Sequence, residues 1–282
     1  MANDHDDSLI RRLARFVWRV LGDFFGKNKG LLLAGGVGYN ALLSLVPLAA
    51  LVLAGVGFFF DEQRVLSVAE AEIQLLVPGR TETLMKIVRT LLDQREMLSG
   101  FSLIFLLFFS SLAFRMLEAA LDLVFHRERT RNRSFLMSAL LPYLFLIALG
   151  LALLALSALT LWVGDALLRV LGFVGLVSLF SAAYLVLPPI KVDRWRALIG
   201  GFVAAVLWEG ARELMTWYFT HLSMVDALYG SFATAIVVLL AMELAAGIVL
   251  LGAQVIAELE RSDRLGVPWY VDPNQFQEPS ST

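Results

Sequence analysis

The sequence predicts an all-α, polytopic membrane protein with six transmembrane helices plus amphipathic helices. Hydrophobic residues make up 59% of its 282 positions and the mean hydropathy is +0.74, whereas soluble domains are about 45–50% apolar. Six runs are long and apolar enough to cross a bilayer, which takes about 20 residues. None of these runs alternates polar and apolar residues as a barrel strand does. So much apolar surface cannot be hidden inside a 31.2 kDa globule, so the bilayer is the expected solvent.

Residues 1–30 predict a cytoplasmic, basic amphipathic helix. Apolar residues recur at helical spacing from Leu9 to Phe24. The other faces carry Arg11, Arg12, Arg15 and Arg19. Such a helix lies on an anionic cytoplasmic leaflet or packs on the cytoplasmic side of its own bundle, and the two roles are compatible. The segment lacks the apolar core of a signal peptide.

The six-helix transmembrane domain is expected over residues 31–258. Its candidate spans are 31–60, 98–125, 135–163, 167–189, 197–220 and 232–258. The first is long enough to tilt in the bilayer or to leave it near Phe58. The fourth is bounded by Pro188 and Pro189, because a proline cannot continue a helix.

Residues 61–97 are expected to form an extracytoplasmic helical insert between the first two spans. Apolar residues from Val65 to Leu76 predict one short helix, and a stripe from Leu84 to Leu92 predicts a second. Pro78 and Gly79 would provide the turn between them. We expect the insert to cap the bundle. The alternatives are that it lines an entrance or forms a subunit contact.

Lysine and arginine predict the orientation. They number six in the N-terminal segment, four in the loop at 127–133, three after the fourth span and two in the tail, against six on the opposite side. By the positive-inside rule both termini of this multi-pass protein are expected in the cytoplasm. The polar cytoplasmic tail, residues 259–282, carries three prolines and is expected to have little regular structure.

Charged residues inside the predicted spans are expensive, so each is a candidate for a substrate or ion pathway. Two clusters share a helix face by spacing, at 115–122 and at 209–213, and Glu243 lies near the middle of the sixth span. In one interpretation the two arginines pair with the acids and hold helices together. Two cations cannot neutralise five carboxylates, so one or two carboxylates are expected to be protonated or to face water. The candidates are Arg115, Glu118, Asp122, Glu209, Arg212, Glu213, Glu243 and, in the first span, Asn40.

Small residues and a proline in the spans predict close helix packing and a kink. The first span is dense in glycine and alanine but follows no strand, so it is not a dinucleotide-binding fingerprint. Pro47 frees a backbone carbonyl about one turn back, which kinks a helix or makes a hinge. The positions assigned to the kink and to packing are Ser44, Pro47, Gly35, Gly38 and Gly252.

Motifs for catalysis, cofactors and nucleic acid are absent from the sequence. Without cysteine it has no disulfide, thiolate metal site or cysteine nucleophile. Its three histidines form no H-x-x-x-H pair, and it contains neither a P-loop nor a G-x-S-x-G elbow. The arginine run at 127–133 is explained by topology. We therefore expect no enzyme activity, no cofactor, no metal and no nucleic-acid partner.

Several strings in a fixed order resemble a known family. The first span reads Gly38 to Pro47 as GYNALLSLVP, and the fifth carries Trp195-Arg196, Gly200-Gly201 and Leu207-Trp208-Glu209. Tyr229-Gly230 precede the sixth span, which ends in LLGAQ at 250–254 with Glu258 after it. Over residues 25–260 the chain resembles the YihY/virulence factor BrkB family. The resemblance implies a six-helix bacterial inner-membrane protein with no established catalytic residues; an older ribonuclease BN label finds no chemical support here.

Three functions follow as hypotheses. The first is a transporter or flippase-like protein for an amphipathic or anionic substrate, with a lipid among the candidates, acting through a polar intramembrane cavity. The alternative is a non-transporting membrane scaffold or envelope-assembly factor that docks through the 61–97 insert and the basic N-terminal helix. The third, an intramembrane or RNA-processing enzyme, has the least support. The expected partners are the lipid bilayer and such a substrate, and a homo-oligomer is left open.

Overall fold

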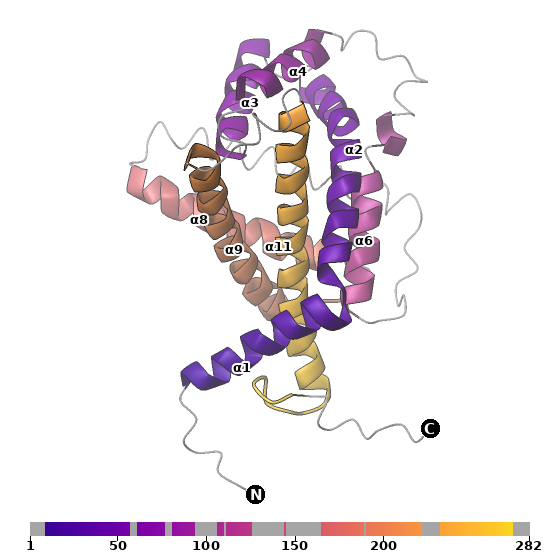
Figure 1. Cartoon of the computed structure of the whole chain (residues 1–282), viewed down its shortest axis with the longest axis vertical. Coiled ribbons are helices and arrows are strands. Elements are labelled where there is room, and N and C mark those ends of the chain that lie inside the picture. Colours follow the sequence, from indigo (N-terminus) through magenta and orange to yellow (C-terminus); the bar gives the residue numbers. More distant parts are fainter. Residues whose placement is uncertain are drawn as a thin grey trace, which may run out of the picture. The chain divides into compact units, whose positions relative to one another are not determined.

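The computed structural model describes residues 9–56, 61–76, 81–93, 106–109, 111–125, 144, 165–188, 190–221 and 232–272. Within these ranges all regular structure is helical, which confirms the all-α prediction for this part of the chain (Figure 1). The elements are α1 (Leu9–Gly22), the π-helical turn η1 (Asp23–Lys27), α2 (Gly30–Val56), α3 (Glu62–Leu76), α4 (Thr81–Asp93), α6 (Leu112–Phe125), α8 (Asp165–Val186), α9 (Arg194–His221) and α11 (Ala233–Arg264).

Some predictions lie outside the described residues. They include the third span at 135–163, apart from residue 144, and residues 98–105 of the second span. The Pro78-Gly79 turn, the arginine run at 127–133, the Tyr229-Gly230 pair and residues 273–282 of the tail are outside as well.

The helix α11 carries the membrane signal most clearly. Among the described helices it has the length and composition to cross a bilayer, over Ala235–Arg264, and only 33% of its most apolar window is buried. A helix in the core of a soluble protein would be mostly buried. Two shorter apolar stretches, Gly30–Ser44 and Val170–Val186, fall in predicted spans. The six-span count itself stays a prediction.

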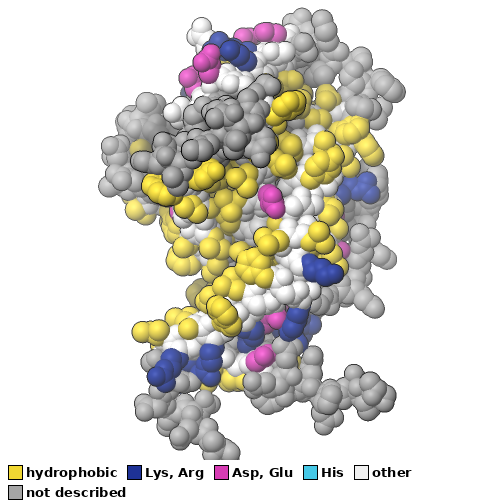
Figure 2. All heavy atoms as spheres, in the orientation of Figure 1, with side chains coloured by type: hydrophobic (Ala, Val, Ile, Leu, Met, Phe, Trp, Pro, Cys, Tyr) yellow, Lys and Arg dark blue, Asp and Glu magenta, His cyan; other side chains and the backbone are white. Residues whose placement is uncertain are grey.

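Exposed apolar side chains along α9 point to the same environment. Phe202, Leu214 and Trp217 are all exposed over the length of this helix. Figure 2 shows hydrophobic side chains covering much of the visible face. Large apolar side chains that are exposed along one helix are typical of contact with a membrane or a partner.

The chain forms two compact units, and each is described by itself. Unit 1 comprises residues 1–33, 118–205 and 247–282, and unit 2 comprises residues 34–117 and 206–246. In unit 1, α8, α9 and α11 approach closely where side chains are smallest. A Cβ on Gly200 would lie 2.9 Å from the Gly252 carbonyl oxygen, and a Cβ on Gly201 would lie 2.8 Å from the Ser181 nitrogen.

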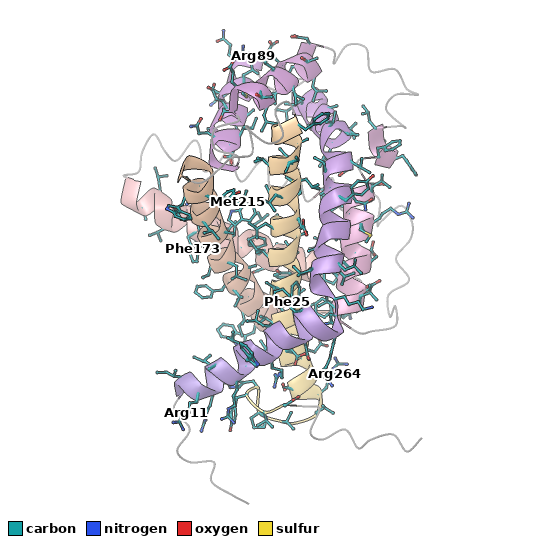
Figure 3. The ribbon with its side chains drawn as sticks, viewed as in Figure 1. Arg11, Phe25, Arg89, Phe173, Met215 and Arg264 are labelled. Atoms are coloured by element: carbon teal, nitrogen blue, oxygen red, sulfur yellow. The ribbon has the colours of Figure 1, made fainter. Side chains whose placement is uncertain are left out.

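Polar and aromatic contacts fix the register of these three helices. The Tyr184 hydroxyl donates a hydrogen bond to the Val249 carbonyl at 2.8 Å, and its ring lies against Gly252. Phe173 meets Phe202 edge to face, with ring centroids 6.0 Å apart (Phe173 is labelled in Figure 3). The tyrosine bond satisfies a polar atom inside an apolar contact, which would otherwise cost free energy.

Also in unit 1, the N-terminal helix α1 packs on the C-terminal part of α11. Phe16 and Val20, on one face of α1, form a buried cluster with Val255. Trp269 covers this cluster, its ring edge to face with Phe16 at 5.8 Å. Residues 265–272 of the tail have little regular structure, as expected, and tertiary contacts hold them against α1. The helix α11 also continues to Arg264, past the predicted span end at 258.

In unit 2, α3 and α4 form the two amphipathic helices predicted for the insert. Val65 of α3 and Leu92 of α4 share a buried cluster with Leu53, near the end of α2. The pair therefore packs its apolar stripes on itself and on α2.

Candidate functional site

Three charged side chains meet on one face of α9 in unit 2. Glu209, Arg212 and Glu213 stand at i, i+3 and i+4, which brings them to neighbouring positions on a helix. Two guanidinium nitrogens of Arg212 donate to one oxygen of Glu209, at 2.6 and 3.2 Å. A longer contact of 3.5 Å joins Arg212 to Glu213. The sequence-predicted pairing of Arg212 is therefore present within its own helix.

This cluster is accessible. The side chains of Glu209, Arg212 and Glu213 are 40%, 35% and 75% exposed. The same helix exposes Val206 and Leu214. One guanidinium stands against two carboxylates, so the cluster carries a formal charge of −1 in an apolar surface. Such a group can exchange its partners with a polar molecule that reaches it.

A second acidic position of unit 2 is Glu243, at the middle of the apolar part of α11. The helix α2 approaches it so closely that a Cβ on Gly38 would lie 2.8 Å from the Glu243 backbone nitrogen and Cα. A Cβ on Gly35 would lie 3.6 Å from a carboxylate oxygen of Glu243. The small residues of α2 thus hold the carboxylate at a helix–helix contact. Within the part of the chain that is described, this carboxylate makes no hydrogen bond or ion pair.

The polar residues of the first span bond to their own helix. The Asn40 amide donates to the Gly36 carbonyl at 2.8 Å, and the buried Ser44 hydroxyl donates to the Ala41 carbonyl at 3.0 Å. Pro47 lies inside α2, which continues as a helix to Val56. One amide hydrogen of Asn40 and the hydroxyl hydrogen of Ser44 are therefore bonded within their own helix.

The three charged residues that were predicted to share one face of α6 differ in their exposure. Arg115 is exposed, and it forms no ion pair with the described residues. Glu118 and Asp122 are half-buried on the same helix. The structure therefore brings together Glu209, Arg212 and Glu213, and places Glu243 against α2, but it does not pair Arg115 with these carboxylates.

A buried polar cluster in unit 1 was not foreseen from the sequence. The Arg19 Nε lies 3.1 Å from a carboxylate oxygen of Glu258, and both side chains are buried. Gln254 donates to the other Glu258 oxygen at 3.4 Å and accepts from the Asn28 amide at 2.6 Å. The spacing of Gln254 and Glu258 at i, i+4 on an apolar helix was the available signal. Nothing in the sequence pattern pointed to Arg19, because its partners are distant in the chain.

Metal chemistry finds no support in the described residues. No group of three or more His, Asp or Glu side chains there could hold an ion.

Comparison with known proteins places the chain in a family of membrane proteins. The family model described as virulence factor BrkB matches residues 23–269. A UPF0761 membrane protein of Azotobacter vinelandii is 28% identical over 264 residues, which is 88% of this chain and 64% of the relative. UPF0761 membrane protein Nmul_A0452 of Nitrosospira multiformis is 29% identical over 280 residues, 92% of this chain and 63% of the relative.

A shorter relative is covered more fully. UPF0761 membrane protein MS0032 of Mannheimia succiniciproducens is 25% identical over 255 residues, 83% of this chain and 86% of the relative. The chain spans a little under two thirds of the length of the first two relatives. No solved structure matches it.

Proposed function

This chain belongs to the virulence factor BrkB family of membrane proteins, and from that premise we propose that it moves an amphipathic or anionic substrate across its membrane. A lipid is the leading candidate for the substrate. The proposal places the protein in a bacterial inner membrane, as its resemblance to the family implies. Both termini would lie in the cytoplasm, as the distribution of lysine and arginine predicts.

The observation that carries the proposal is Glu243. Its carboxylate stands in the N-terminal half of α11, the helix that is long and apolar enough to span a bilayer, against the glycine face of α2. An ionisable group at that depth is costly and is found where a protein handles ions, protons or polar substrates. A carboxylate there can accept hydrogen bonds from a passing headgroup.

Within the α9 cluster, which as a whole carries a formal charge of −1, Arg212 is the group that can bind an anion. A guanidinium matches a phosphate or carboxylate with paired hydrogen bonds. Arg212 is held by Glu209 at 2.6 Å but remains partly exposed. An anionic substrate can therefore compete with Glu213, whose contact with Arg212 is the longer one. Arg212 and Glu243 belong to the same compact unit.

The experiment is lipid movement in proteoliposomes. The full chain is reconstituted with fluorescent phosphatidylglycerol, and the labelled lipid that reaches the outer leaflet is followed with and without a proton gradient. We expect movement by the wild-type chain, and a loss of about tenfold or more in Arg212→Gln, because a charge-assisted bond is removed.

The conservative Arg212→Lys variant serves as the second test, since it keeps the charge but loses the paired geometry. Its rate should lie between those of wild type and Arg212→Gln. Variants are compared only when they elute as folded protein. Movement by none of the proteins under any gradient would contradict the proposal for phospholipids and would favour a membrane scaffold instead.

A further inference from the structure

The helix α1 has three faces: one packs on α11, one meets the segment 265–272, and one is exposed. Phe16 and Val20 pack against Val255 of α11. A second face is apolar but exposed, with Ile10 at 77% and Val17 also exposed. Along α1, Figure 2 shows hydrophobic and basic side chains next to one another. An exposed apolar face on a basic helix is the form that lies in a membrane interface.

The third face of α1 is cationic and meets the segment 265–272. Arg19 donates to the carbonyl of Trp269 at 3.0 Å and to the carbonyl of Val271. The guanidinium of Arg12 lies 4.6 Å from the centre of the Tyr270 ring. These contacts fold the segment back along α1, and they position Tyr270 and Val271 opposite the helix.

A pocket of about 670 Å³ lies between α1, η1 and this segment. Arg15, Trp18 and Arg19 line it from α1, Lys27 from η1, and Tyr270 from the returning segment. Its volume falls within the range of about 300–1,000 Å³ that small-ligand sites occupy. Trp18 is 79% exposed and also lines the pocket. By helical spacing it stands at the border between the exposed apolar face and the cationic face, so the pocket opens beside the apolar face.

The charges around the pocket favour an anion. Its lining holds the cations Arg15, Arg19 and Lys27 against the carboxylates Asp23 and Asp272. Asp23 is neutralised by Lys27 at 2.8 Å and approached by Arg261 at 4.0 Å.

Two further charges reach the pocket through contacts with its lining. Glu258 pairs with Arg19, and Arg12 lies over the Tyr270 ring. With Arg12, Arg261 and Glu258 added to the charges of the lining, five cations stand against three carboxylates.

We propose that this pocket binds the phosphate-bearing headgroup of an anionic phospholipid from the leaflet on which α1 lies. Guanidinium and ammonium groups bind the phosphate, while Trp18 and Tyr270 have the amphipathic rings that favour the interfacial region. The acyl chains would lie along Ile10 and Val17. The site does not depend on transport, and it would serve equally in a chain that moves no lipid.

The test measures lipid binding to the full chain purified in mild detergent. Native mass spectrometry follows the first bound molecule of phosphatidylglycerol, and phosphatidylcholine with the same acyl chains serves as the zwitterionic comparison. Arg15→Gln removes a cation from the α1 part of the lining, and Lys27→Gln removes one from the η1 part. Their matched controls are Arg11→Gln and Lys29→Gln, which make the same charge change outside the lining.

We expect phosphatidylglycerol to bind more tightly than phosphatidylcholine, and binding to weaken about tenfold in either pocket variant, because each loses a charged partner of the phosphate. The two controls should stay within about twofold of wild type. If Arg11→Gln or Lys29→Gln weakened phosphatidylglycerol binding as much as the pocket variants do, the lipid would be binding to a diffuse basic surface and the proposed pocket site would be wrong. Equal binding of phosphatidylcholine would overturn the preference for an anion.

A third arm separates a lipid from a soluble phosphate. Glycerol 3-phosphate and inorganic phosphate are added as competitors of phosphatidylglycerol. The proposal predicts no displacement at concentrations equal to that of the lipid, because the soluble compounds lack the chains that contact α1. Displacement at equal concentration would assign the pocket to a soluble ligand. No lipid movement is measured in this assay, so its outcome is independent of that of the transport experiment.

Discussion

Single side chains join parts of unit 1 that are far apart in the sequence. Arg19 binds the carboxylate of Glu258 and the carbonyl of Trp269, which is 250 positions away. A buried ion pair adds little net stability, but the loss of one partner leaves the other charge buried and unpaired. Arg19 is therefore a positioning residue for the segment 265–272.

The first prediction concerns that residue. Arg19→Gln should destabilise the packing of the segment on α1 by about 3–5 kcal/mol, because Glu258 is left without its charge partner. Hydrogen–deuterium exchange at 265–272 should accelerate accordingly. Arg194→Gln, an exposed arginine at the start of α9, is the control and should leave exchange there unchanged. Unchanged exchange in Arg19→Gln would show that Trp269 and the apolar cluster suffice to hold the segment.

The second prediction concerns the glycine at the α2–α11 contact. In Gly38→Ala the new Cβ would stand 2.8 Å from the Glu243 backbone. Overpacking of this kind costs about 1–3 kcal/mol, so the temperature at which the purified protein loses its monodisperse peak should fall. Gly210→Ala has open space around the new Cβ and removes a glycine from a helix interior, so that temperature should hold or rise. Equal stability of the two variants would contradict the close approach.

At the scale of elements, α3 and α4 form a local unit because each buries an apolar stripe that neither could bury alone. Their sequence carries this information in full, since the stripe at i, i+3 and i+4 fixes both the helices and their facing sides. Burial raises the pKa of the Glu72 carboxyl above its ordinary value. The folded pair therefore holds the proton more tightly than the unfolded chain does, and its stability falls as pH rises through the window between the two pKa values.

The third prediction follows from that sign. Glu72→Gln removes the titrating group, so the pair should be better protected in the variant than in wild type at pH 7. Below the ordinary pKa of glutamate, where both states are protonated, the two proteins should be equal. The measurement is hydrogen–deuterium exchange over 62–93, with the two proteins compared at each pH. A difference that is the same at both pH values would contradict a titration of Glu72.

Some of the helices could be predicted from the sequence, and other features of the fold could not. Apolar runs predict α2, α8, α9 and α11, because a bilayer demands length and composition that are visible residue by residue. The extension of α11 to Arg264 and the packing of the segment 265–272 on α1 were not predictable in that way. They depend on Arg19, Gln254 and Trp269, whose partners come from the opposite end of the chain. Likewise, spacing alone predicted the Arg212 pair, whereas the contact of Glu243 with Gly38 needed the structure.

For the whole molecule, the distribution of basic residues predicts both termini on one side of the membrane and α4 on the other. The chain has no cysteine, so each introduced cysteine reports its own position. The fourth prediction uses Arg11→Cys, Arg89→Cys and Arg264→Cys, three exposed positions labelled in Figure 3. An impermeant maleimide should modify Arg89→Cys in cells with a permeable outer membrane, and the other two only after the inner membrane is opened.

Two other labelling patterns would contradict the predicted topology. Labelling of Arg11→Cys and Arg264→Cys from opposite sides would require an odd number of spans and would overturn the six-helix prediction. Labelling of all three from one side would contradict the prediction that the insert lies on the extracytoplasmic face.

The central claim is that Glu243 serves transport, and one comparison in proteoliposomes tests it most directly. Glu243→Gln keeps the shape of the side chain and removes its charge, while Glu70→Gln makes the same change at an exposed position of α3. We predict that movement of labelled phosphatidylglycerol falls at least about tenfold in Glu243→Gln and is unchanged in Glu70→Gln, with both variants eluting as folded protein. Movement at the wild-type rate in a folded Glu243→Gln variant would contradict the claim and leave this carboxylate a structural residue of the α2–α11 contact.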